Sequence, residues 1–335
     1  MRAVIAIDAG GTSTRAVLVD QHGRRLGSGR AAGGNPTSAG PAEAVAAVIS
    51  AIEQALRPAG TDPGAVETVL VAHAGGHDDY QPGIERGLAA LGVRAPVQRA
   101  GDVAALFASG THERRGTALI AGTGAIGGVI RDGGIARTVD GTGWLLGDAG
   151  SGFWIGHLVA RAVVDDLDGG PSTALTPALL DALGLGPVAP ADGAGVLDGR
   201  PAVLGALLRR LYALRPVQLS RFAPLAFGLA GRDPLADEVL HGAVAALAAL
   251  LGRLRRIEGE GPLVVGGSVL VEGVLPLGPA FTAPLLEAAG DAVPVPVADG
   301  LVGAAVLALR SQGVEVGERL FAVLAAEVRG AEQPR

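Results

Sequence analysis

Short apolar runs alternate along the chain with glycine-rich turns and with stretches whose apolar residues recur every three or four positions. Short apolar runs bounded by turn residues predict strands, and the wider spacing predicts helices. In the first third of the chain we expect strands at 3–8, 14–20, 26–31, 67–72 and 95–98, and helices at 41–56, 82–91 and 102–109. Strands that alternate with helices indicate an α/β architecture.

The pattern of the opening strands returns about 111 residues later. An apolar run closed by Gly-Thr-Gly at 122–124 matches the earlier run closed by Gly-Gly-Thr at 10–12. Superposing the two threonines puts Gly122 on Gly11 and keeps the strands that follow in register. The alternative is chance, because a chain with 54 Gly offers many such pairs. We interpret the repeat as a gene-duplicated pair of similar domains.

The second half is longer and more helical than the first. Helices are expected at 151–167, 233–257, 281–289 and 299–309, and strands at 262–265 and 292–297. These elements predict one domain over 1–115 and another over 116–311. The Pro- and Gly-rich segment 171–232 shows no site that we can name. A last helix within 312–330 could return to the first domain or serve a homodimer.

The chain contains neither Cys nor Lys, since all 27 of its basic residues are Arg. The absence of Cys excludes disulfides, thiolate nucleophiles, Cys-ligated zinc and Cys-ligated iron–sulfur clusters. The absence of Lys excludes a Walker A lysine and a Schiff base. Any phosphate chemistry must therefore use backbone N–H groups, hydroxyls, Arg or a metal.

Charge and hydropathy bear on the partners of the protein and on its cellular compartment. The net charge of -6 argues against a nucleic-acid partner. A carboxylate at position 8 comes too early for a signal-peptide core, and the longest uncharged runs are too short and Gly-rich to span a bilayer. We expect a cytoplasmic protein with no membrane partner.

The segment from Asp8 to Thr14 is the strongest chemical signal. Glycines let the backbone approach a ligand closely, so that N–H groups can cradle phosphate oxygens. Thr12 and Thr14 add hydroxyls, and Asp8 at the strand end could hold hydrated Mg²⁺. The alternative is a hairpin that needs Gly10 and Gly11 only for its turn geometry.

Two further glycine sites follow strands. Gly122, Thr123 and Gly124 are by themselves more often a turn than a site, but their register with the first hairpin indicates a second phosphate loop. Gly266 and Gly267 could pass under an adenine or a ribose. Two facing glycine hairpins would clamp a triphosphate without any Lys.

Asp102 opens a short apolar helix between the two halves. It could simply cap that helix, a role for which Asp is among the best residues. It could also act as a general base at the cleft between the domains. The two roles are compatible, because a carboxylate at a helix start can also face a ligand.

A Gly-punctuated loop over 142–152 leads into the helix expected at 151–167. Asp148 lies between glycines and could accept two sugar hydroxyls, and Trp144 could supply an apolar wall. The alternative is turn chemistry with Trp in the core. His73 and His77 suggest a metal site, but they lack the glutamate of the helical zinc motif, so we expect none.

In this order, these segments resemble the actin/hsp70/sugar-kinase superfamily, and within it the BadF/BadG/BcrA/BcrD-type group that contains N-acetylglucosamine kinase. The resemblance covers nearly the whole chain, and its most specific part is G-W-x-x-G-D-x-G-S over 143–151. It implies two ribonuclease-H-like domains around a hinged cleft that holds ATP, Mg²⁺ and an amino sugar.

The resemblance also implies roles for individual residues. The first phosphate loop comprises Gly10, Gly11, Thr12 and Thr14, the second comprises Gly122, Thr123 and Gly124, and Gly266 and Gly267 touch the adenosine. Asp102 matches the general base that takes the proton of the sugar 6-hydroxyl. The sugar contacts match Asn35, Gly143 and Asp148, and Asp8 matches the acidic residue near Mg²⁺.

The expected activity is therefore ATP-dependent phosphorylation of N-acetylglucosamine to its 6-phosphate. Glucosamine and an N-acetylmuramic-type sugar remain open, because an acetamide pocket cannot be recognised from these residues. A regulatory ATPase that acts on a protein partner is the alternative of another class. The absence of Cys disfavours both the zinc-bearing ROK sugar kinases and the iron–sulfur activators of dehydratases.

Overall fold

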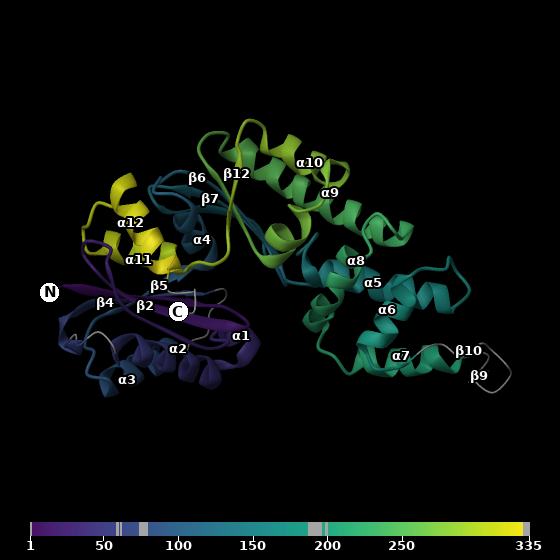
Figure 1. Ribbon diagram of the computed structural model, residues 1–335, viewed down its shortest axis with the longest axis horizontal. Coiled ribbons are helices and arrows are strands. Elements are labelled where there is room, and N and C mark those ends of the chain that lie inside the picture. The colour runs from purple at the N-terminus through teal and green to yellow at the C-terminus, as the bar shows by residue number, and fades with distance from the viewer. Residues whose placement is uncertain are drawn as a thin grey trace.

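The computed structural model describes residues 2–57, 60, 62–73, 80–186, 196–197 and 200–330, and two five-stranded mixed sheets organise it (Figure 1). The first sheet has the order β3-β2-β1-β4-β5. Its strands are β1 (Ala3–Ala9), β2 (Ser13–Asp20), β3 (Arg25–Ala32), β4 (Val66–His73) and β5 (Val97–Gly101). β1 to β3 form an antiparallel meander, and β4 and β5 run parallel to β1.

The second sheet repeats this arrangement with the order β12-β11-β6-β7-β8. Its strands are β6 (Gly116–Ala121), β7 (Ala125–Arg131), β8 (Gly134–Asp140), β11 (Leu263–Gly266) and β12 (Pro294–Val297). The meander again comes first, and the two later strands again add in parallel to its first strand. A separate pair of two-residue strands, β9 (Val196–Leu197) and β10 (Arg200–Pro201), lies outside both sheets.

An irregularity in the strand pairing is repeated as well. The register shifts between Leu18 and Val19 in the first meander and between Val129 and Ile130 in the second, positions that are 111 residues apart. The repeated topology and the repeated shift agree with the two similar units expected from the sequence.

The turn that joins the first two strands differs in length between the two sheets. Four residues separate the paired ends of β1 and β2, whereas three separate those of β6 and β7. The superposition of Gly122 on Gly11 is therefore wrong by one residue, and Gly122 takes the place of Gly10. A sequence comparison without gaps cannot detect one extra residue in a turn.

Helices cover both faces of the first sheet. On one face lie α1 (Pro36–Ala39), α2 (Pro41–Leu56) and α3 (Tyr80–Ala90), and on the other lie α11 (Leu301–Ser311) and α12 (Glu318–Arg329). Ile5 and Ile7 of β1 pack towards α2 and α3, and Val4 and Ala6 pack towards α11 and α12. A strand buried on both faces needs a continuous apolar run, and this is why the alternation typical of half-buried strands is absent from β1.

α4 (Asp102–Gly110) packs against β6, β7 and β11 of the second sheet on one side and against α11 on the other. The two helices cross closely at Gly303, where an added Cβ would lie 1.8 Å from the carbonyl oxygen of Ala105. The backbone N–H of Gly303 also donates to the Ser109 hydroxyl at 2.8 Å. The α4–α11 pair is thus the packed layer between the two sheets.

α11 and α12 come last in the chain but contact the first sheet. α11 packs on β1, β2 and β4. In α12, the carboxylate of Glu327 accepts the backbone N–H of Arg25 at 3.4 Å, and Leu324 lies against Gly23. The domain boundaries at 115 and 311 stay a prediction.

Between its meander and β11, the second half carries helices that the first lacks, namely α5 (Gly152–Leu167), α6 (Leu175–Ala182), α7 (Ala202–Tyr212) and α8 (Ala223–Gly228). α9 (Pro234–Ile257) precedes β11 and α10 (Pro279–Ala289) precedes β12, as α2 precedes β4 and α3 precedes β5 in the first half. Shorter helical turns are η2 (Pro63–Ala65) in the first half, and η3 (Pro216–Phe222) and the π-helical η4 (Val269–Val274) in the second.

Within the described ranges, α9 is the one helix that is long and apolar enough to cross a bilayer by length and composition. Half of that segment is buried in protein, and its leucines belong to the core of the second half. The apolar character of α9 is thus explained by its place in the core.

Candidate active site

Three polar residues meet at one edge of the first sheet. Asp8 is the last but one residue of β1, His73 ends β4, and Asp102 directly follows β5. The parallel register pairs Asp8 with Ala72 and His73 with Gly101. The carboxyl ends of the three strands therefore bring these side chains together, at the place where open α/β sheets commonly bind ligands.

Asp8 is surrounded by two acids and a cation. Its Oδ2 accepts the backbone N–H of Gly300 at 3.3 Å, and Arg15, its partner across the strand pair, forms a salt bridge with Asp299. Burial and then the negative charge of Asp299 raise the pKa of Asp8 to about 7, with a smaller rise from Asp102; Arg15 and the Gly300 N–H oppose the rise. A bound divalent cation would favour the ionised form.

Asp102 is the first residue of α4, and Gly101 stands at the N-cap position. Its carboxylate accepts the backbone N–H of Val103 at 2.8 Å. Burial raises the pKa of Asp102, and the Val103 N–H and the nearby His73 partly offset that rise. A carboxylate with a raised pKa is a better proton acceptor, as long as it stays ionised at the working pH.

The first glycine loop rests on the segment that carries Asn35. The backbone N–H groups of Gly34 and Asn35 both donate to the carbonyl of Gly10 at 3.1 Å. Thr12 is exposed on the loop, whereas Thr14 is buried and its hydroxyl donates to the carbonyl of Ala32 at 2.8 Å. The hydroxyl of Thr14 therefore joins β2 to β3.

The second glycine loop is fixed to the start of α5. The N–H of Gly152 donates to the carbonyl of Gly122 at 2.7 Å, and the N–H of Phe153 donates to the carbonyl of Thr123 at 3.1 Å. Ser151 caps the same helix through the N–H of Trp154. These bonds hold the loop rigidly while leaving the side chain of Thr123 exposed.

Gly122 and Gly267 form a backbone cradle. Gly267 has φ +87, and a Cβ there would lie 2.3 Å from the carbonyl oxygen of Ala121. At Gly122 the nearest atom to an added Cβ is the Cα of Gly267, at 3.9 Å. Glycine at 267 is thus required by both conformation and space.

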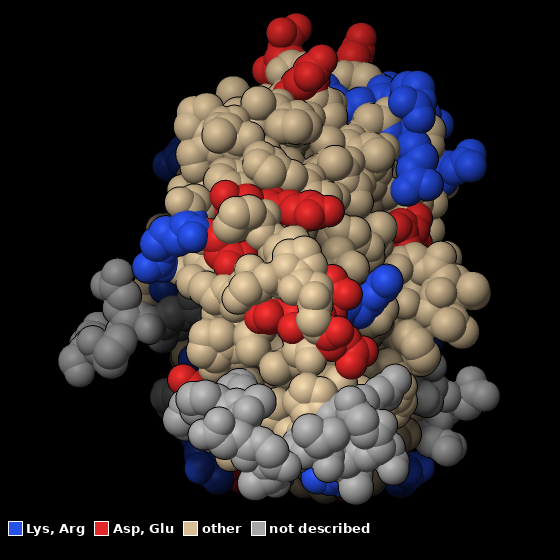
Figure 2. Space-filling model, turned by 90° about the vertical axis from the view of Figure 1, so that its right-hand side faces the viewer, with Lys and Arg blue, Asp and Glu red and all other residues tan. Residues whose placement is uncertain are grey.

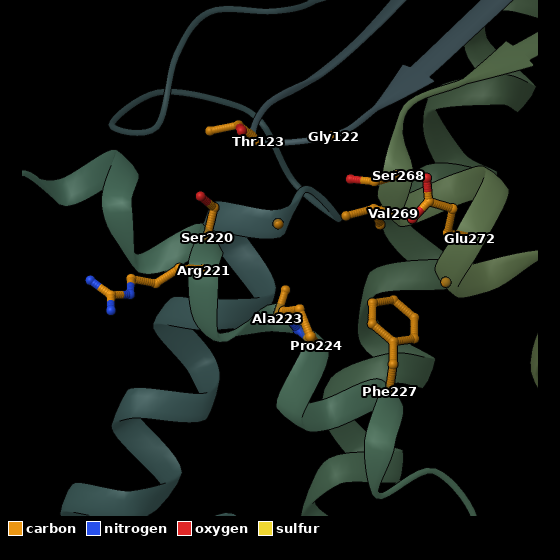
Figure 3. Close-up of a pocket in the computed structure, with 12 residues that line it drawn as sticks. Gly122, Thr123, Ser220, Arg221, Ala223, Pro224, Phe227, Ser268, Val269 and Glu272 are labelled. Atoms are coloured by element: carbon orange, nitrogen blue, oxygen red, sulfur yellow. The ribbon is translucent and has the colours of Figure 1, made fainter. Parts of the chain in front are cut away.

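A cavity of about 310 Å³ opens beside this cradle (Figure 3). Gly122 and Thr123 border one side, and the hydroxyls of Ser220 and Ser268 and the ring of Phe227 line others. The size is at the lower end for small-molecule pockets, and the mixture of apolar walls with few polar groups is typical of them.

Asp148 lies against the second glycine loop. It adopts φ 59, its Oδ1 accepts the N–H of Ala125 at 3.1 Å, and its own N–H donates to Asp140 at 2.9 Å. A Cβ on Gly124 would lie 3.0 Å from the Asp148 carboxylate. Burial raises the pKa of Asp148, the Ala125 N–H lowers it, and Asp140 raises it further.

The loop before Asp148 exposes apolar side chains. Trp144 is 41% exposed and lies against the ring of Phe153, with 5.8 Å between the ring centroids. Leu146 is 82% exposed. Gly143 has φ 84, which a larger residue would adopt only with strain. Trp144 borders a groove of about 1430 Å³ along α5 and α7.

Charged side chains are unevenly distributed at that end of the molecule. On the face that carries α6 and α7, Asp and Glu side chains gather near the middle and Arg side chains near the upper right edge (Figure 2). The basic side chains on the described part of this face thus lie apart from the acidic ones near its middle.

A model of the BadF/BadG/BcrA/BcrD ATPase family matches residues 5–308. The chain belongs to this family. The N-acetyl-D-glucosamine kinase of Dictyostelium discoideum is 32% identical over 196 residues, which are 54% of this chain and 60% of that protein. The match therefore spans less than two thirds of this curated relative.

Solved structures show the same architecture as this family member. A Chromobacterium violaceum protein that carries the name of an N-acetylglucosamine kinase superposes with a TM-score of 0.67 and 26% identity, over 92% of this chain and 99% of that one. The ROK hexokinase of Thermus thermophilus gives a TM-score of 0.52 and 25% identity over the same shares. The α/β fold with two actin-like sheets is confirmed.

The sequence reading of this family member missed Arg15 and Asp299. Asp299 follows β12 as Asp102 follows β5, so the repeat itself could have indicated it. Arg15 looked like an ordinary strand residue, because nothing local shows that its partner lies 284 positions later.

The described residues contain no group of three or more His, Asp or Glu arranged to hold a metal ion. Of the residues that suggested such a site, His73 lies at the end of β4. His77, with the neighbouring Asp78 and Asp79, falls outside the described residues.

Proposed function

We propose that this family member is an ATP-dependent kinase that phosphorylates the 6-hydroxyl of N-acetylglucosamine and releases N-acetylglucosamine 6-phosphate and ADP. The observation that carries the proposal is the position of Asp102, at a sheet edge beside Asp8 and at the start of the helix that joins the two sheets. The names of its relatives support the substrate class.

The residues present fit ATP with Mg²⁺. Gly122 and Gly267 provide a cradle that a side chain would fill, and the adjoining cavity would take the nucleoside. Gly10, Gly11, Thr12 and the loop at 122–124 would meet the phosphates through backbone N–H groups and exposed hydroxyls. Asp8 would hold Mg²⁺ through water, and the ion would neutralise charge on the phosphates.

In the proposed reaction, Asp102 accepts the proton of the sugar 6-hydroxyl. The bond from O6 to the γ-phosphorus forms while the bond from that phosphorus to the β,γ-bridging oxygen breaks, and ADP leaves. Asn35, Gly143 and Asp148 would orient the sugar, with Trp144 as an apolar wall. Such reactions depend mainly on positioning and electrostatics, so closure of the two units would exclude water and limit ATP hydrolysis.

The test is an ADP-release assay with N-acetylglucosamine, glucosamine, N-acetylmuramic acid and no sugar. We expect the fastest release with N-acetylglucosamine, and ³¹P and ¹H NMR of the product should place the phosphate on O6. Faster turnover of one of the other two sugars would identify that sugar as the substrate instead.

The regulatory alternative predicts a different result in the same assay. ATP turnover that no sugar stimulates would overturn the kinase proposal, and a partner recovered by pull-down would then support the ATPase. Asp102→Asn serves as the control, because a base-dependent reaction should fall by about 10²–10⁴-fold in that variant.

A further inference from the structure

His73 is a buried titratable side chain that the proposed mechanism does not use. It is 5% exposed at the end of β4, and its strand neighbour in the register is Gly101, which directly precedes Asp102. The imidazole is close enough to Asp102 to interact with it electrostatically. The position of this buried polar ring beside the proposed base suggests that it has a role in the reaction.

The other side of His73 faces α3. Its ring meets that of Tyr80 edge to face, with 4.9 Å between the centroids. Tyr80 is fully buried, and its hydroxyl donates to the carbonyl of Gly34 at 2.9 Å. Residue 34 immediately precedes Asn35, the proposed sugar contact.

The contacts continue to the first phosphate loop. Gly34 and Asn35 both donate their N–H groups to the carbonyl of Gly10. A packed path of direct contacts thus runs from the imidazole through Tyr80 to the loop proposed to hold the sugar and to the loop proposed to hold phosphate.

We propose that His73 is a positioning residue, which fixes the carboxylate of Asp102 relative to the sugar loop at 33–35. The inference rests on the proposed role of Asp102 as base. Asp102 stands at the start of a helix, where its side chain has several staggered rotamers, and a buried ring on the neighbouring strand end restricts them.

The imidazole also affects the charge of the base. Burial raises the pKa of Asp102, and His73 and the Val103 N–H lower it. Among the described residues, the other charged groups near this edge are Asp8 from β1, which interacts with Asp102, and the Arg15–Asp299 pair beside Asp8. Removal of the imidazole should therefore raise the pKa of Asp102 and leave less ionised base at mildly acidic pH.

The experiment compares His73→Ala, His73→Asn and Tyr80→Phe in the full chain, with kcat and KM measured across pH. We expect His73→Ala to lower kcat roughly ten- to a hundredfold with little change in the KM for ATP. The acid limb of kcat/KM should move to higher pH in both His73 variants. His73→Asn should recover part of kcat, because its amide fills part of the space, but not the position of the limb.

Tyr80→Phe tests the other half of the path. It keeps the ring against His73 and removes only the hydrogen bond to Gly34, so we expect a higher KM for the sugar with an unchanged acid limb. An unchanged limb and kcat in a folded His73→Ala protein, with circular dichroism as the check of folding, would overturn the inference.

The two proposals fail in different ways. If Asp102→Asn abolishes turnover while both His73 variants behave as wild type, only the role of His73 is lost. If Asp102→Asn is fully active, the assignment of the base is wrong, and the inference about His73 falls with it.

Discussion

The two sheets share one topology, yet their corresponding strand ends carry different chemistry. In the first sheet Asp8 pairs across the hairpin with Arg15, and in the second the corresponding pair is Ile120 with Ile126. The first hairpin has charges that suit a hydrated cation, whereas the second has apolar side chains beneath a backbone cradle. The two units thus share a backbone arrangement but differ in the side chains at the corresponding positions.

The same contrast holds where the last parallel strand of each sheet ends. Asp102 follows β5 and Asp299 follows β12, and each carboxylate accepts a backbone N–H at the start of the next helix. Asp299 is held by the guanidinium of Arg15, whereas Asp102 has the imidazole of His73 nearby. A carboxylate in a salt bridge is a weak base, so this contrast supports Asp102, rather than Asp299, as the proposed proton acceptor.

The largest expected effect separates these two acids. Asp102→Asn should lower kcat by about 10²–10⁴-fold with little change in the KM of either substrate, because it removes the proton acceptor. Asp299→Asn should lower kcat by less than about tenfold and mainly reduce the stability of the fold, because it leaves Arg15 partly buried without its carboxylate. Steady-state kinetics and urea unfolding of both variants measure the difference.

Equal losses of kcat in the two variants would contradict this division. They would mean that Asp299 also takes part in the chemistry, and that the repeat supplies two working acids rather than one.

A second prediction compares the first glycine loop with the cradle that Gly122 and Gly267 form. Gly267→Ala should raise the KM for ATP and destabilise the fold by about 1–3 kcal/mol, because φ +87 and a Cβ 2.3 Å from the Ala121 carbonyl both oppose a side chain. Gly10→Ala should cost less, since its Cβ would lie 3.1 Å from the nearest atom, the Ser13 carbonyl oxygen. Calorimetric titration with ATP and thermal unfolding provide the measurements. A larger loss in Gly10→Ala would show that the first loop is the tighter cradle.

Much of the fold was predictable because the signals are local. The apolar spacing over 41–56 gave α2 with its observed ends, helped by Pro41 at the first helical position. The repeated glycine turns gave both hairpins. The extra residue in the first loop was not predictable, because glycines on either side of a turn align equally well in two registers.

The candidate site was less predictable than the fold. Asp8, Asp102 and the loop at 122–124 were recognisable, because a carboxylate or glycine directly after an apolar strand is a local signal. The Arg15–Asp299 pair and the cavity beside Phe227 were not, since each joins segments far apart in the chain. Thr14 resembles a phosphate ligand because of its neighbours in sequence, but its side chain is buried and its hydroxyl donates to the carbonyl of Ala32.

A third prediction concerns stability alone, in the layer between the two sheets. Gly303→Ala should destabilise the fold by about 1–3 kcal/mol, because the new Cβ would lie 1.8 Å from the Ala105 carbonyl and force α4 and α11 apart. Gly205→Ala in α7 is the matched control: its Cβ would meet only the Arg209 side chain, at 3.6 Å. That variant should stabilise the fold by about 0.5–1 kcal/mol, as alanine does inside a helix. Urea unfolding of both proteins measures the change in the free energy of unfolding, which should be negative for Gly303→Ala and positive for Gly205→Ala. A Gly303→Ala protein as stable as wild type would mean that the two halves are less tightly packed than the α4–α11 crossing indicates.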